Sequence, residues 1–199
     1  MTPTPTPESD KIWAIDEIFG YTMNHNECNA VSSLTPKLYQ NDAKSFCWQQ
    51  NFSFNDFIFL SSKCEDVFLD DVTLLNDDNS VVPLEMVIEV LRNAKSFHYV
   101  FDFGTAMEVV TIDTVNELVK IPHFKELNRF VLEGIPESFD IQTFYEYIKG
   151  NKKTKICLGF DDEYSDDYLV LLQTIVYEIR STENRDYKFP YINIDSMED

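Results

Sequence analysis

Hydrophobic and polar residues follow two different periods along most of this chain. Residues 154–160 alternate polar and apolar side chains, which is the two-residue period of a half-buried strand. After Ser165, apolar residues recur at intervals of three and four, as they do on one face of a helix. A strand is therefore predicted at 154–160, followed by a four-turn helix with Ser165 as its N-cap. The apolar face of this helix consists of Tyr168, Leu171, Leu172, Ile175, Val176 and Ile179.

The same succession of strand and helix is predicted three more times upstream. Each of these helices has its own start signal: Pro83 for the first, a Thr-x-x-Glu capping box at Thr114 for the second, and Asp140 as N-cap for the third. A short helix is expected at 52–60, and a last edge strand at 187–194. The strands of the three units are expected at 66–72, 97–103 and 129–133.

The spacing of these units predicts the class of fold. Aligned on Leu69, Tyr99, Leu132 and Leu158, the units follow one another at intervals of 30, 33 and 26 residues. Strand–helix units at this period are typical of a parallel α/β solenoid. The expected fold is therefore an irregular, leucine-rich-repeat-like α/β solenoid of strand–helix units that occupies residues 52–195. A closed, doubly wound sheet is the alternative.

The N-terminal segment has a different pattern. Ile12, Ile15, Ile18 and Phe19 are spaced as on one face of a helix, and further helices are expected at 27–33 and 37–46. Residues 11–48 are therefore predicted to form a small helical module. Thr and Pro alternate in the first ten residues, which predicts a disordered, extended tail at 1–10.

Composition and charge narrow the classes of partner. The formal net charge is −19, which argues against binding to nucleic acid or to an anionic membrane surface. No apolar run approaches the roughly 18–20 residues that span a bilayer. The four Cys residues have no CxxC spacing and no secretory signal before them, so reduced thiols in a cytoplasmic or nuclear protein are expected.

Catalytic signatures are missing from the sequence. The histidines are His25, His98 and His123, and their spacing matches no zinc motif. The chain holds only 5 Gly and contains neither a phosphate-binding Gly loop nor a Gly-x-Ser-x-Gly motif. No enzyme activity, cofactor or metal is therefore expected.

Two segments near the N-terminus resemble an F-box. They are residues 16–21 (DEIFGY) and 29–39 (NAVSSLTPKLY), within a match over roughly 12–45. An F-box holds a Skp-type adaptor and through it a cullin, and the resemblance places adaptor contacts at Ile15, Ile18, Phe19, Leu34 and Leu38. From these residues alone, the other interpretation is an ordinary helical cap on the α/β domain.

The rest of the chain is similar to a nematode family in which an F-box precedes an FTH domain, a domain of unknown function. The resemblance covers about residues 55–194. It implies a substrate-recognition subunit of a cullin-type (SCF) ubiquitin ligase whose repeat domain binds a protein target. The alternative is a repeat-type interaction scaffold without ligase coupling. The matching motifs are Lys63-Cys64, 121–124 (IPHF), 135–149 (IPESFDIQTFYEYIK), 165–168 (SDDY), 172–179 (LQTIVYEI) and 184–188 (NRDYK).

Strand parity predicts the surface that would bind this target. If Leu69, Tyr99, Leu132 and Leu158 face the core, the residues next to them point outward. The outward set would include an apolar column of Phe68, Val100, Val131 and Cys157. Solenoids bind partners on such a face; the alternative is that a further layer covers it. The predicted partner-binding residues are Phe68, His98, Val100, Arg129, Val131 and Lys155.

Overall fold

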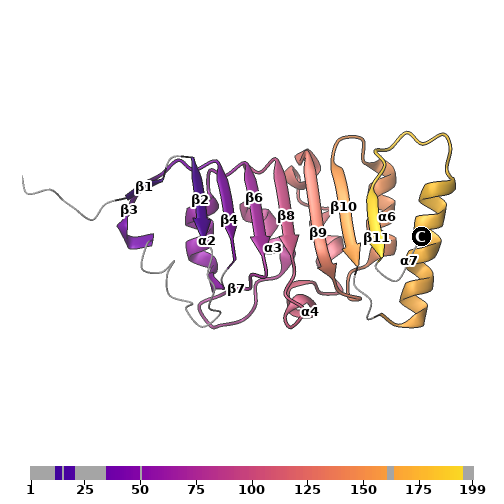
Figure 1. The fold of residues 1–199 in the computed structure, drawn as a ribbon, viewed down its shortest axis with the longest axis horizontal. Coiled ribbons are helices and arrows are strands. Elements are labelled where there is room, and N and C mark those ends of the chain that lie inside the picture. The colour runs from indigo at the N-terminus through magenta and orange to yellow at the C-terminus, as the bar shows by residue number, and fades with distance from the viewer. Residues whose placement is uncertain (1–11, 15, 21–34, 50, 161–163, 195–199) are drawn as a thin grey trace, which may run out of the picture.

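A computed structural model of the protein describes residues 12–14, 16–20, 35–49, 51–160 and 164–194. Its main element is a seven-stranded sheet in which every neighbouring pair is parallel. The strands are β2 (Glu17–Gly20), β4 (Ser45–Trp48), β6 (Asp66–Asp70), β8 (Ser96–Val100), β9 (Arg129–Ile135), β10 (Lys155–Phe160) and β11 (Tyr191–Ile194). They lie side by side in the order of the chain (Figure 1).

Two small parallel pairs accompany this sheet. The first joins β1 (Ile12–Ala14) to β3 (Leu38–Asn41), and the second joins β5 (Phe52–Ser53) to β7 (Leu74–Leu75). The mixed α/β class is therefore confirmed, with a mostly parallel arrangement of strands.

Helices cover one face of the large sheet, and the other face is turned toward the viewer in Figure 1. The α-helices of the described residues are α2 (Phe54–Ser61), α3 (Leu84–Val90), α4 (Ala106–Val109), α5 (Thr114–Leu118), α6 (Ile141–Gly150) and α7 (Asp166–Ser181). Two 3₁₀ turns, η1 (Thr35–Lys37) and η2 (His123–Glu126), complete the described elements. From β6 to β11, one or more helices lie between successive strands of the large sheet, so the alternation of strands and helices predicted for residues 52–195 is confirmed.

The start signals of the helices explain most of their boundaries. The side chains of Asp140 and Ser165 accept hydrogen bonds from backbone N–H groups three residues on, at 3.0 and 3.3 Å, as predicted for N-caps. Pro83 directly precedes α3. The capping box expected at Thr114 is wrong, since Asp113 is the N-cap of α5 and the Thr114 hydroxyl donates instead to Glu85 Oε2 at 2.8 Å.

The hydrophobic core lies between the sheet and the helices. Alternate strand residues face it, and each is at most 2% exposed, so the predicted strand parity is confirmed. These core residues are Val67, Leu69, Phe97, Tyr99, Phe130, Leu132, Ile156 and Leu158.

The helical module expected at 11–48 is wrong in the residues that the structure describes. Residues 12–14, 17–20, 38–41 and 45–48 are strands, and η1 is one 3₁₀ turn. β-branched and aromatic residues such as Ile18 and Phe19 favour strands, and pairing with β4 decides between the two periods. The predicted helix at 27–33 and the tail at 1–10 lie outside the described residues.

The sheet also crosses the boundary predicted between the two segments. β4 pairs with β2 on one side and with β6 on the other. Trp48 of β4 is buried, stacks on Phe46 and lies so close to Gly20 of β2 that a side chain at Gly20 would overlap the indole ring. Residues 17–20 and 45–48 therefore pack as part of the same sheet as the rest of the chain.

Candidate functional site

The sheet face opposite the helices carries one row of mostly apolar side chains, which we call the central row. Because all seven strands pair in parallel, one residue from each strand lies at the same level. At a strand spacing of about 4.8 Å, six intervals give a row roughly 29 Å long. In the order of the strands, the central row consists of Phe19, Cys47, Phe68, His98, Val131, Cys157 and Tyr191.

The middle of the central row is held in place by side-chain contacts. The rings of Phe68 and His98 lie with their centroids 4.6 Å apart. His98 Nε2 is 2.7 Å from Glu133 Oε1 on the next strand. Side chains that already have fixed positions lose little conformational freedom when a partner binds.

Exposure is greatest at the two ends of the row. Phe19 is 65% exposed and Tyr191 is 61% exposed, whereas Phe68 and His98 are half-buried. Val131 was predicted to be an accessible contact, but it is buried, with 3% of its surface exposed. Val131 has a short side chain and lies on a central strand between His98 and Cys157, whereas the exposed ends of the row lie on the edge strands.

The predicted apolar column needs a second correction. Val100 does not lie beside Phe68 and Val131, because it is paired with Asp70 and Glu133 one level closer to the carboxyl ends of the strands. His98 takes its place in the row. The predicted column residues all point to the open face, as their alternation along the strands predicted. Which of them lie side by side depends on the register between β6 and β8, and this register pairs Phe68 with His98.

A second row, closer to the amino ends of the strands, carries charged side chains. We call it the charged row; it consists of Glu17, Ser45, Asp66, Ser96, Arg129 and Lys155. Its four charged members are exposed, and in the described ranges none has an ion pair or a side-chain hydrogen bond. Both predicted cations, Arg129 and Lys155, are therefore available on this face.

The predicted adaptor contacts do not form one surface in the described residues. Ile18 and Leu38 are partly buried and pack against the hydrophobic core. Phe19 points to the open face of the sheet and belongs to the central row. Ile15 and Leu34 lie outside the described residues.

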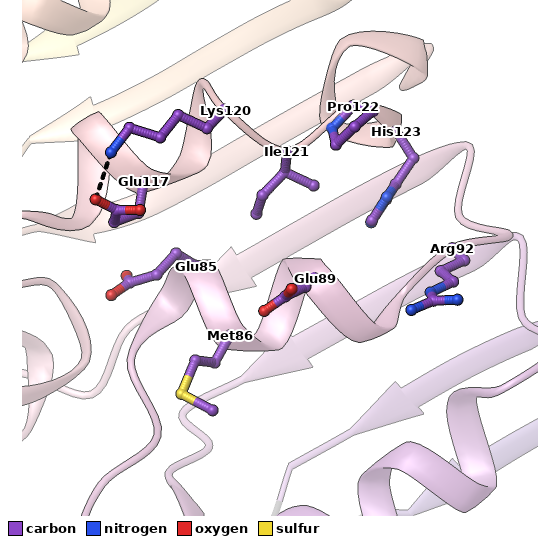
Figure 2. A pocket seen from close by; sticks show the side chains of 9 residues that line it. All are labelled: Glu85, Met86, Glu89, Arg92, Glu117, Lys120, Ile121, Pro122 and His123. Atoms are coloured by element: carbon purple, nitrogen blue, oxygen red, sulfur yellow. Dashed lines mark hydrogen bonds and ion pairs between the residues drawn. The ribbon is translucent and has the colours of Figure 1, made fainter.

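A groove lies on the helical side of the described residues (Figure 2). It encloses about 580 Å³, with Met86 and Glu89 of α3 on one side and Ile121 and His123 on the other. His123 Nε2 lies 2.8 Å from a backbone carbonyl of α3, which ties the two sides together. Most of the lining side chains are polar or charged, whereas typical small-molecule sites are lined mainly by apolar and aromatic side chains. Sequence reasoning missed this groove because its two sides come from different units.

The described residues contain no cluster placed to hold a metal ion, and two of their cysteines have raised pKa values. Within them, no cluster of three or more His, Cys, Asp or Glu side chains is placed to hold a metal ion. Burial raises the pKa of the Cys64 thiol to about 11, and burial, with Glu17 and Asp70 nearby, also raises the pKa of Cys47. A raised pKa keeps a thiol protonated at neutral pH, which disfavours a nucleophilic role for either cysteine.

Sequence reasoning did not place the two end residues of the central row on the open face of the sheet. It assigned Phe19 to a helix, and it placed Tyr191 in an edge strand without predicting the register of that strand with its neighbour. The alternation in residues 45–48 could have revealed Cys47 as an outward-facing strand residue.

Among the helices that the structure describes, none is long and apolar enough to cross a membrane. Comparison of the chain with models of protein families, with curated proteins and with solved structures finds no match.

Proposed function

We propose that this chain is a non-catalytic protein-binding module whose target docks on the open face of the sheet. The observation that carries the proposal is the central row, in which side chains from seven strands line up with an exposed aromatic residue at each end. Aromatic side chains are enriched at protein interfaces and at binding hot spots. An apolar strip beside exposed charges is also typical of protein interaction sites.

We further propose that the strand–helix units form an irregular, leucine-rich-repeat-like solenoid. The order of the strands supports this, because the strands of the large sheet lie side by side in the order in which they occur in the sequence. Helices on one face leave the other face open, and solenoid proteins use such extended surfaces for binding.

A more specific proposal couples this module to a cullin-type ubiquitin ligase through a Skp-type adaptor. It is supported by the resemblance of the chain to the F-box and FTH family. The strands at 12–14, 17–20, 38–41 and 45–48 count against it, because the resemblance to an F-box predicted helices there. This observation favours the alternative, an interaction scaffold without ligase coupling that acts in the cytoplasm or nucleus.

The target-binding proposal is tested by changing two aromatic residues of the central row together. The double variant Phe68→Ala/Tyr191→Ala and the control Tyr177→Ala should be used as baits in quantitative affinity capture from cells. Tyr177 is a suitable control because it is an exposed aromatic residue that lies on α7, outside the central row. Targets of the open face should be lost with the double variant and retained with the control. Equal capture by all three baits would refute the proposal.

Ligase coupling is tested separately with purified Skp-type adaptor and cullin. Wild-type protein should bind the adaptor at micromolar concentration, and Ile18→Asp should reduce that binding while the target is still captured. If the wild-type chain binds no adaptor even at high micromolar concentration, the scaffold interpretation replaces the ligase interpretation.

A further inference from the structure

The charged row is divided by the sign of its charges. Glu17 and Asp66 lie on strands of the first half of the sheet, and Arg129 and Lys155 lie on β9 and β10 in the second half. All four are exposed, and none is neutralised within the described residues. The charged row therefore has an acidic half and a basic half along one line.

The basic half is unusual in so acidic a protein. Arg129 and Lys155 lie directly opposite each other, and like charges in this position destabilise a sheet. The chain has 35 Asp and Glu residues, yet none of those within the described ranges pairs with these two cations. By contrast, Lys153 of the preceding turn is paired with Glu126 at 2.7 Å. Two adjacent, unpaired cations beside an apolar strip are suited to an acidic group on a partner.

The acidic half of the charged row is suited to basic groups on a partner. Asp70 lies beyond the central row on the same strand as Asp66, and its only side-chain partner in the described residues is the neutral amide of Gln49. Carboxylates therefore flank the central row on both sides at β6. A partner with Lys or Arg side chains would complement this half, and the net charge of −19 would attract such a partner at long range.

The repeat distance of the central row indicates the conformation of the partner. Side chains of the row recur about every 4.8 Å. Side chains on one face of a helix recur about every 5.4 Å, and those on one face of an extended strand about every 6.8 Å. Over three intervals a helix drifts from the row by about 2 Å and a strand by about 6 Å. A helix of about 19 residues would match the 29 Å length of the row.

We infer that the target segment is an amphipathic helix with an acidic N-terminal half and a basic C-terminal half. Its apolar face would pack on the central row, its acidic half over Arg129 and Lys155, and its basic half over Glu17, Asp66 and Asp70. Acidic residues near the N-terminus and basic residues near the C-terminus also stabilise a helix through its dipole. The charge pattern would thus fix the direction of the helix on the sheet. This inference rests on the proposed function and adds the chemistry of the partner.

The test uses the full chain and two synthetic 20-residue peptides. Both have leucines at helical spacing and a hydrocarbon staple on the solvent face that makes them helical. The bipolar peptide has Glu in its first half and Lys in its second half, and the control peptide has the same composition with Glu and Lys alternating. Fluorescence anisotropy should show the bipolar peptide binding about five- to tenfold more tightly, the gain expected from several exposed charge pairs.

Protein variants locate the site and the direction. Arg129→Glu/Lys155→Glu should abolish the advantage of the bipolar peptide, and Phe68→Ala/Tyr191→Ala should weaken both peptides, whereas Tyr177→Ala should change neither. A nitroxide at the N-terminus of the bipolar peptide should broaden the NMR signals of β9 and β10. Broadening of β2 and β4 instead would overturn the proposed direction.

Three other outcomes would overturn the inference: equal affinities for the two peptides, no binding up to about 1 mM, and binding that the central-row variants leave unchanged.

Failure of the helical-partner inference can be distinguished from failure of the proposed protein-binding function. If captured targets still require Phe68 and Tyr191 while the peptides fail, the protein-binding function stands and the helical partner does not. If neither targets nor peptides require the row, both are refuted.

Discussion

Replacing Gly20 tests whether the N-terminal segment is a strand of the sheet. A Cβ atom at this position would lie closer than 3.0 Å to ring carbons of Trp48. The indole ring is buried, stacks on Phe46 and lies 5.6 Å from the ring of Phe52, so it has little room to move away. We therefore expect Gly20→Ala to destabilise the protein through overpacking.

The expected loss is about 1–3 kcal/mol, which is typical when atoms are added to a well-packed core. Because β2 is an edge strand of the described sheet, it can shift away from β4, and this places the value toward the lower end of the range. For a chain of this length the loss corresponds to a decrease in Tm of about 2–12 °C. Urea denaturation followed by circular dichroism would measure it.

Gly150→Ala is the matched control, since a Cβ atom there would have no neighbour within 4 Å. Its effect should be neutral or slightly stabilising. The decisive measurement is a double-mutant cycle with Trp48→Leu, which removes the ring that causes the overlap. The two changes should then be coupled by about 1 kcal/mol or more, whereas residues that are not in contact should be additive within about 0.5 kcal/mol. Additivity would refute the pairing of β2 with β4.

Three further predictions concern single side chains elsewhere in the chain. Leu172→Ala should cost about 2–5 kcal/mol in urea denaturation because this side chain is buried in the core, whereas Val170→Ala, on the exposed face of α7, should cost less than about 0.5 kcal/mol. Asp140→Ala should cost about 1 kcal/mol through loss of the N-cap of α6, and Asp140→Asn should retain most of that stability; equal losses would argue against the cap. The pKa of Cys64 is raised from about 9 in the unfolded chain to about 11 in the folded state. The stabilising contribution of the protonated Cys64 thiol to the free energy of unfolding is therefore complete below about pH 9 and is lost as the pH rises toward 11. The free energy of unfolding should therefore fall less between pH 9 and 10 in Cys64→Ala than in the wild type, and identical slopes would contradict this assignment.

The part of the fold that could be predicted from sequence is the part with strong local signals. Around α6 and α7, a strand with alternating residues precedes a clear N-cap and a continuous apolar stripe, and both helices begin where Asp140 and Ser165 predicted. Each of these signals acts within a few residues. Local sequence therefore determined both the element type and its start.

The N-terminal segment was mispredicted because its pattern satisfies two periods. Ile12, Ile15 and Ile18 are spaced as on a helix, but these residues are also strong strand formers. What decides the outcome is pairing between 17–20 and 45–48, which are separated by more than twenty residues. A single sequence carries no signal that links two such segments.

The candidate site was predictable only as far as strand parity reaches. Parity showed that Phe68 points away from the core, but it could not show that His98 rather than Val100 lies beside it. The burial of Val131 was equally inaccessible, because sequence alone does not place β9 between β8 and β10. Alignment between strands, rather than any property of one strand, sets the composition of the central row.

The order of the strands has a consequence for how the protein is made. As the chain leaves the ribosome, β4 can pair with β2 and β6 can pair with β4 before any later strand exists. At roughly 5–20 residues per second, a unit of about 30 residues takes a few seconds to synthesise, far longer than the microseconds in which short strands pair. Each new strand therefore finds its template already in place. The nascent protein can extend its sheet in one direction during translation, and the unpaired edges of the described sheet are then those of β2 and of the most recently added strand.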